Sequence, residues 1–202
     1  MYSAKIKSLY EEYGELIEFC RSNGQVSFEL YINDTYKKAL LLSAASYFET
    51  VITKTIHDFV NRKTKCNVEI VSFVDNKAMK RQYHTFFNWD GSNANQFFGL
   101  FGDAFKRKAR EEIHTKKLDE AEVAFLTIGR ERNRLVHQNY IEVQINDTFE
   151  EIFAKYEKAC DFVDLITQLH MPPQKCSLTA DDGASPPPEW CTASAEMVHG
   201  GR

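Results

Sequence analysis

The chain has 202 residues, of which 43% are hydrophobic, and this is enough for one globular domain with a sizeable core. Its longest nearly apolar stretch, residues 39–48, is far shorter than the roughly 20 residues that a membrane helix needs. The N-terminal sequence continues directly into charged, helix-patterned residues, without the apolar region of a secretory signal. We therefore expect one domain that stays in the cytoplasm and does not enter a membrane.

The spacing of cysteine and histidine predicts no metal site. The five cysteines lie far apart, without a Cys-x-x-Cys pair, and none has a histidine beside it at metal-ligand spacing. The six histidines form no His-x-x-x-His pair either. We therefore expect reduced thiols, no zinc site and no other cofactor.

The first third of the chain predicts two helices. Over residues 3–21, apolar side chains recur at spacings of three and four, which is typical of an amphipathic helix, and residues 22–24 predict its end. The polar residues 33–35 offer the next N-cap. From there to about Asn61 we expect a long, largely buried helix at the centre of the core.

The middle of the chain predicts two further helices and a connector. Residues 67–74 alternate and are β-branched, but no second strand pattern is available for pairing, so we expect an extended connector there. Asp75 can cap a helix that runs to about Phe87, and turn-forming residues then fill positions 88–93. Another helix is expected from about residue 94 to residue 114.

The last part of the domain predicts two more helices. Residues 119–139 begin with acidic side chains, which favour a helix N-terminus through the macrodipole. Residues 141–145 are expected to be extended, and residues 146–148 to cap a final helix that ends near His170. Residues 1–171 are thus predicted to form an all-α bundle of about five to six helices.

The C-terminal segment, residues 172–202, differs in composition from the rest. It contains three consecutive prolines, several Gly and Ser residues and little aliphatic side chain. Such a segment buries too little apolar surface to offset the entropy lost on ordering, so we predict a disordered tail.

Chemistry-bearing side chains concentrate in Gly129-Arg130-Glu131-Arg132-Asn133-Arg134-Leu135-Val136-His137-Gln138-Asn139-Tyr140. Within this stretch, Arg132-Asn133-x-x-x-His137 has the form Arg-polar-x-x-x-His, which resembles the catalytic motif of the HEPN superfamily. Tyr47-Phe48-Glu49, Phe86 to Asp90 and residues 93–102 are similar to the HEPN-like nuclease branch that is grouped with RiboL-PSP-type domains. The likeness spans roughly residues 35–170.

This resemblance implies a small helical, metal-independent ribonuclease. Family members commonly form homodimers whose two motifs line one composite cleft. The resemblance also implies the setting of a toxin or an anti-phage defence effector, restrained by an antitoxin or another regulatory protein. RNA would be the substrate, and a 2′,3′-cyclic phosphate or its hydrolysis product would remain.

Metal-free RNA cleavage needs a base, an acid and positive charge, and the motif contains suitable side chains. His137 can serve as base or acid at neutral pH. The resemblance selects Arg132 for charge stabilisation, since its fork of donors matches phosphate oxygens. Asn133 would orient His137 or bind phosphate. For His137, the alternative is a structural role at a helix interface.

Helix geometry limits how these side chains can cooperate. Asn133 and His137 are four residues apart and lie on nearly the same face, whereas Arg132 lies about 140° from His137. One straight helix therefore does not aim both at one phosphate, unless a second copy contributes or Arg132 wraps round the helix. Arg130 and Arg134 share the His137 face, and their alternative is ion pairing with Glu131 or other surface acids.

Two further groups are candidates for supporting roles. The resemblance implies that Glu49 packs beside the motif helix and pairs with Arg132 or His137, and the alternative is a structural ion pair or simple exposure. Basic residues cluster despite the net charge of −4, and one cluster provides candidates for RNA binding, with a solvated helix face as the alternative. These candidates are Lys106, Arg107, Lys108 and Arg110.

Two other functional classes remain open. A non-catalytic HEPN-like module would use the motif surface for protein interaction or RNA binding in a defence or toxin–antitoxin complex. The trio of Arg132, Asn133 and His137 argues against it, because a scaffold has no chemical need for these side chains together. A metal-dependent nuclease is disfavoured because the sequence has no clustered Asp, Glu and His set.

Overall fold

The structure is a computed structural model that describes residues 2–170, so the predicted tail at 172–202 lies outside the described residues. Across residues 2–170 it contains eight α-helices, one five-residue π-helix and no strand, which confirms the predicted all-α class. The helices outnumber the five or six expected, because a predicted connector is helical and two predicted helices are divided. None of the described helices is long and apolar enough to cross a lipid bilayer.

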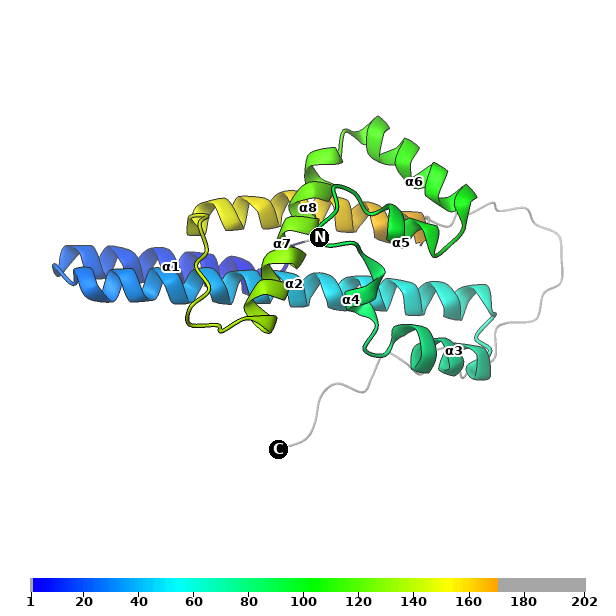
Figure 1. The fold of residues 1–202 in the computed structure, drawn as a ribbon, viewed down its shortest axis with the longest axis horizontal. Coiled ribbons are helices and arrows are strands. Elements are labelled where there is room, and N and C mark those ends of the chain that lie inside the picture. Colours follow the sequence, from blue (N-terminus) through cyan, green and yellow to red (C-terminus); the bar gives the residue numbers. More distant parts are fainter. Residues whose placement is uncertain (1, 171–202) are drawn as a thin grey trace, which may run out of the picture.

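Helices α1 (Ala4–Ser22) and α2 (Val26–Lys63) form an antiparallel hairpin. Figure 1 shows that α2 runs the length of the molecule and that the α1–α2 turn projects beyond the other helices. The prediction that this second helix begins after residues 33–35 was wrong. Asn33 Oδ1 accepts a hydrogen bond from Tyr13 Oη at 2.9 Å and Asp34 pairs with Lys38 at 2.8 Å, so these polar side chains are satisfied inside a helix.

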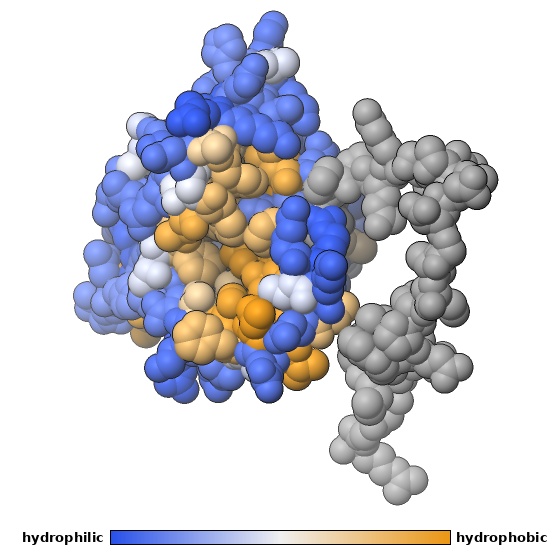
Figure 2. All heavy atoms as spheres, turned by 90° about the vertical axis from the view of Figure 1, so that its right-hand side faces the viewer, coloured by the Kyte–Doolittle hydropathy of each residue, from blue (hydrophilic) through white to orange (hydrophobic). Residues whose placement is uncertain are grey.

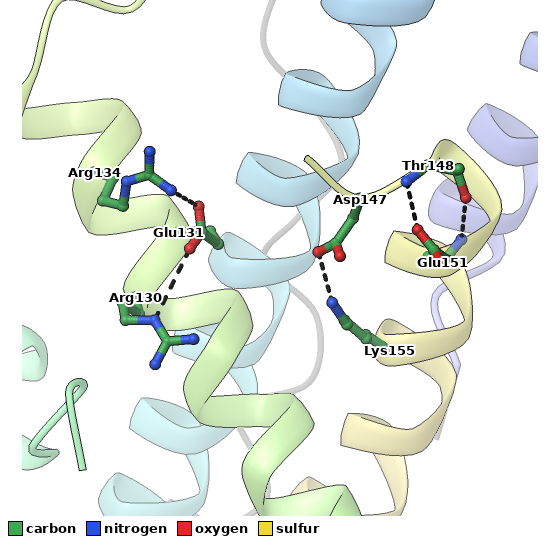
Figure 3. A network of polar contacts seen from close by, with 7 residues as sticks. All are labelled: Arg130, Glu131, Arg134, Asp147, Thr148, Glu151 and Lys155. Atoms are coloured by element: carbon green, nitrogen blue, oxygen red, sulfur yellow. Dashed lines mark hydrogen bonds and ion pairs between the residues drawn. The ribbon is translucent and has the colours of Figure 1, made fainter. Parts of the chain in front are cut away.

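Helix α8 (Phe149–His170) packs along α2 and closes the core. Thr148 and Glu151 form a reciprocal capping box, because each backbone N–H donates to the other side chain, at 2.7 and 3.1 Å (Figure 3). The predicted N-cap of the last helix is therefore confirmed. Aromatic rings fill much of the space between α1, α2 and α8, with Phe149 stacked on Tyr13 at 3.8 Å between ring centroids.

The segment after α2 differs most from the prediction. The expected extended connector is helix α3 (Val68–Val74), whose N-cap Asn67 accepts a hydrogen bond from the backbone N–H of Ile70 at 3.0 Å. The single helix expected from Asp75 is divided into the π-helix η1 (Asp75–Met79) and the short helix α4 (Tyr83–Phe86). Arg81, at φ +62°, lies in the left-handed region and separates them.

The helix predicted over residues 94–114 is also divided. Helix α5 (Asn95–Gly99) and helix α6 (Asp103–Lys116) are separated at Gly102, whose φ of +93° a side chain would disfavour. Helix α7 (Asp119–His137) follows and ends two residues before the predicted position 139. It packs against α8 and α2, and its C-terminal end carries the motif.

One end of the molecule carries an apolar surface around a groove of about 400 Å³. Figure 2 views this end, where hydrophobic side chains gather inside a hydrophilic border. The groove lies between α2, η1, α4 and the α5–α6 junction, and its apolar lining residues are Ile56, Val60, Val74, Ala78, Met79, Phe86, Leu100 and Phe101.

Candidate active site

The sequence of α7 explains why the motif lies at the edge of the core. Its first turn is acidic and its last turn contains Arg134 and His137, a distribution that complements the helix macrodipole. Buried side chains recur at spacings of three and four along the helix and face α2 and α8, and these include Ala121, Ala124, Phe125, Ile128 and Leu135. Residues 130–134 are only half-buried, so their polar groups reach the surface.

A tryptophan packed on a glycine brings an earlier segment against α7. The Trp89 ring lies directly over Gly129, where a Cβ atom would be 2.0 Å from Trp89 Cζ3. Trp89 Nε1 donates to the backbone carbonyl of His84 at 2.9 Å, and Gln96 Nε2 donates to the carbonyl of Thr85 at 2.7 Å. The segment from α4 to Trp89 is therefore held beside the motif.

A cleft of about 550 Å³ lies between this segment and the C-terminal half of α7. One wall comes from α7, where Arg130, Asn133, Arg134 and His137 lie at the spacing of a single helix face. The facing wall comes from the segment after η1, and it consists of His84, Thr85, Phe87, Asn88, Trp89, Asp90 and Gln96. The structure thus brings together four of the six residues predicted for the catalytic and supporting positions.

The two arginines of the cleft share one carboxylate. Glu131, whose side chain is 16% exposed, contacts Arg134 Nη1 at 2.6 Å and Arg130 Nε at 3.9 Å (Figure 3). Pairing with Glu131, the alternative considered for both arginines, is therefore observed. A guanidinium has five N–H donors, so one shared carboxylate leaves donors on both side chains for a ligand.

Arg132 faces a different recess from His137, as the angular separation on the helix predicts. It lines an inner pocket of about 10 Å³ next to the cleft, and this pocket has little more than the room for one water. Arg132 Nη2 lies 3.9 Å from Glu49 Oε2 on α2, and its Nη1 donates to Asn133 Oδ1 at 3.2 Å. Glu49 thus pairs with Arg132, and Asn133 lies where the two recesses meet.

Tyr83 gives the inner pocket a phenol that stays protonated at neutral pH. Burial raises the pKa of Tyr83 above its usual value of 10, nearby Glu49 adds to the rise, and Arg132 opposes it. The pocket is therefore lined by one guanidinium, which pairs with Glu49, and by one neutral phenol beside apolar walls. This environment holds Arg132 toward α2 and away from the open cleft.

The four cations predicted on α6 lie outside the cleft, and one of them has a structural partner. Arg110 forms an ion pair with Glu122, which is 2% exposed and also accepts a hydrogen bond from the Ala94 backbone N–H at 2.6 Å. Arg107 and Lys108 are exposed, and Lys106 is half-buried. Arg110 thus joins α6 to α7 and to the start of α5.

Among residues 2–170, no group of three or more His, Cys, Asp and Glu side chains is placed to hold a metal ion. Cys20 and Cys160, both buried, are free thiols. Burial raises the pKa of the Cys160 thiol to about 11, so this thiol is protonated at neutral pH.

Sequence reasoning missed His84. This exposed residue lines both the inner pocket and the cleft. It directly precedes the Thr85 to Asp90 segment, part of which carries the family likeness, but it is 53 positions away from His137 along the chain. No local sequence spacing could have predicted that His84 lines the cleft, because the position of His84 depends on how Trp89 packs on Gly129.

Comparison with known proteins agrees with this architecture. The model of the RiboL-PSP-HEPN family matches residues 7–169, from α1 to the end of α8. No curated protein and no solved structure gave a significant match. The family match covers most of the chain and includes every residue of the cleft. The chain therefore belongs to the RiboL-PSP-HEPN family.

Proposed function

We propose that this protein is a metal-independent endoribonuclease whose active site is the cleft on α7. The observation that carries the proposal is the convergence of one imidazole, one amide and two guanidiniums, from His137, Asn133, Arg130 and Arg134, on a single wall. Imidazole transfers protons at neutral pH, and guanidinium binds phosphate oxygens. Cleavage of RNA by its own 2′-hydroxyl requires proton transfer and stabilisation of the negative charge on phosphate, and these side chains can supply both.

Each side chain has a role that follows from its place. Arg130 and Arg134 bind the scissile phosphate through donors that Glu131 does not use. His137 transfers a proton at the reacting oxygens, and Asn133 supplies an amide to the phosphate or to His137. Arg132, held by Glu49, contributes its positive charge from the inner pocket and fixes the orientation of the Asn133 amide.

A second copy of the chain completes the site in this proposal. The surface next to His137 is apolar and exposed, with Val136 at 51%, Tyr140 at 40% and Ile141 at 85% exposure. Such side chains at the rim of a polar cleft suit a contact with a symmetric partner. The dimer would close the cleft and bring a second Arg132 and His137 to the bound RNA.

Lys106 and Arg107, together with Lys108, would contact RNA beyond the cleft, whereas Arg110 supports the fold through Glu122. Phosphate contacts release counterions, so replacing all three outer cations by alanine should reduce the salt dependence of RNA affinity. Unchanged salt dependence would mean that this part of α6 is only a solvated face.

We further propose that the protein acts in the cytoplasm as a toxin or defence effector, and that an antitoxin or another regulatory protein restrains it.

The proposed chemistry predicts the nature of the cut ends. The purified protein in excess EDTA should cleave a mixed-sequence RNA and leave 2′,3′-cyclic phosphate ends, because the 2′-oxygen is the attacking group. The DNA of the same sequence should remain intact, since it lacks that hydroxyl. Mass spectrometry of the products would show this, and cleavage of both polymers, or of neither, would contradict the proposal.

The apolar groove at the α3 end favours a second candidate function. A non-catalytic interaction module would need exposed apolar surface, and the groove lined by Met79, Leu100 and Phe101 supplies it. This candidate predicts stable association with a protein partner and no cleavage of RNA. The cut-end experiment therefore separates the two functions.

A further inference from the structure

A second histidine faces the cleft from the wall opposite α7. His84 belongs to α4, and its backbone carbonyl is held by Trp89 Nε1 at 2.9 Å. The next residue, Thr85, is held through its carbonyl by Gln96. The backbone is thus held at the carbonyls of His84 and of the residue after it, while the His84 side chain is exposed and lines the same cleft as His137.

The surroundings of His84 suit a group that exchanges protons with a bound phosphodiester. Across the cleft are the guanidiniums of Arg130 and Arg134 and the amide of Asn133. Besides His84, the charged and titratable groups that line the cleft and inner pocket are Tyr83, Asp90, Arg130, Arg132, Arg134 and His137. Glu131 and Glu49 pair with the arginines from outside these linings. Within the described residues, no hydrogen bond or ion pair engages the His84 ring.

We infer that His84 and His137 of the same chain form the acid–base pair of the cleft. This inference rests on the proposed ribonuclease function and deepens it. One histidine alone cannot both accept and donate a proton in a single step, because its two roles require opposite protonation states. Two histidines on facing walls satisfy both requirements within one protomer.

The step balances with these two residues. The neutral imidazole of one histidine accepts the proton of the 2′-hydroxyl while the 2′-oxygen attacks phosphorus and the new O–P bond forms. The bond from phosphorus to the 5′-oxygen breaks, and the imidazolium of the other histidine gives its proton to that oxygen. The products are a 2′,3′-cyclic phosphate and a 5′-hydroxyl, and the two imidazoles have exchanged protonation states.

A bridging sulfur substitution tests the pair. The substrates are an RNA that the wild-type protein cuts in EDTA and the same RNA with sulfur in place of the 5′-oxygen at the cut site. A thiolate leaves without being protonated, so this substrate does not need the acid. On normal RNA, His84→Ala and His137→Ala should each lower the cleavage rate by about 10²–10⁴-fold.

On the sulfur substrate, one of the two variants should recover to within about tenfold of wild type and thereby identify the acid. The other should remain impaired. His114→Ala, on the exposed surface of α6, is the matched control and should cut both substrates like wild type. A purely structural role for the two histidines would impair both substrates equally, so failure of both variants to recover on the sulfur substrate would overturn the inference.

Mixing the variants tests whether the pair belongs to one chain. Refolding His84→Ala together with His137→Ala should not restore cleavage, because the inferred pair needs both imidazoles on the facing walls of one chain's cleft, and each chain then lacks one of them. Recovered activity would place the two histidines on different subunits and contradict the inference.

The outcomes also separate the acid–base pair from the proposed function. If His84→Ala cuts normal RNA like wild type, the pair is refuted but the proposed ribonuclease function stands. If wild type does not cut RNA in EDTA, both fail together.

Discussion

Replacing Glu122 with alanine is expected to lower the free energy of unfolding by about 3–5 kcal/mol, the cost of breaking a buried ion pair from one side. Glu122 is 2% exposed, and it binds both Arg110 and the backbone N–H of Ala94. Without it, a guanidinium and a buried amide lose their acceptor, and the contact between α6, α7 and the start of α5 weakens. Chemical denaturation followed by circular dichroism measures the loss.

Glu120 provides a matched control on the same turn of α7. It pairs with Lys158 at 2.8 Å, and both side chains are exposed to solvent. Exposed ion pairs contribute little to stability, so Glu120→Ala should leave the unfolding curve almost unchanged. Equal effects of the two substitutions would show that the Arg110–Glu122 pair does not connect the helices as described.

The Gly129→Ala variant should be destabilised by about 2 kcal/mol, although alanine normally favours a helix over glycine. The added Cβ would lie 2.0 Å from the Trp89 ring, so the ring must move off α7. The wall that carries His84 would move with it, and RNA cleavage should fall together with stability. Thermal unfolding would measure the loss of stability, and Trp fluorescence would report the displacement of the Trp89 ring.

Gly14 in α1 is the control for that substitution. A Cβ at Gly14 would meet no atom within 4 Å, so Gly14→Ala should stabilise the protein by about 0.5–1 kcal/mol. In a Trp89→Leu background, Gly129→Ala should cost less than in the wild type, because the smaller side chain leaves room. If both glycine variants changed stability in the same direction, the close packing of Trp89 on Gly129 would be refuted.

Local signals in the sequence predicted the features whose partners lie close along the chain. Residues 146–148 were predicted to cap the last helix, and the observed cap joins Thr148 to Glu151, only three residues away. The start of α2 was misplaced because Asn33 is satisfied by Tyr13, twenty residues earlier, and no helix-cap rule includes that partner. The α3 segment was misread because its β-branched residues favour strands, whereas the Asn67 cap favours a helix.

In the candidate site, too, the features set by local spacing were predictable and those set by distant contacts were not. Helix periodicity correctly placed Arg130, Asn133, Arg134 and His137 on one face and turned Arg132 away from it. The opposite wall could not be predicted, because it depends on a tryptophan that packs on a glycine 40 positions later. The structural role of Arg110 was equally hidden, since a run of basic residues does not reveal which one faces a buried carboxylate.

Cleavage of a labelled mixed-sequence RNA in excess EDTA tests most directly whether this cleft is a metal-independent ribonuclease site. Wild type, His137→Ala and His114→Ala would be compared at the same protein concentration and the same oligomeric state. We predict cutting by wild type and by His114→Ala, and a loss of about 10²–10⁴-fold in His137→Ala. Undiminished cutting by His137→Ala, or no cutting by any of the three proteins, would contradict the proposed site.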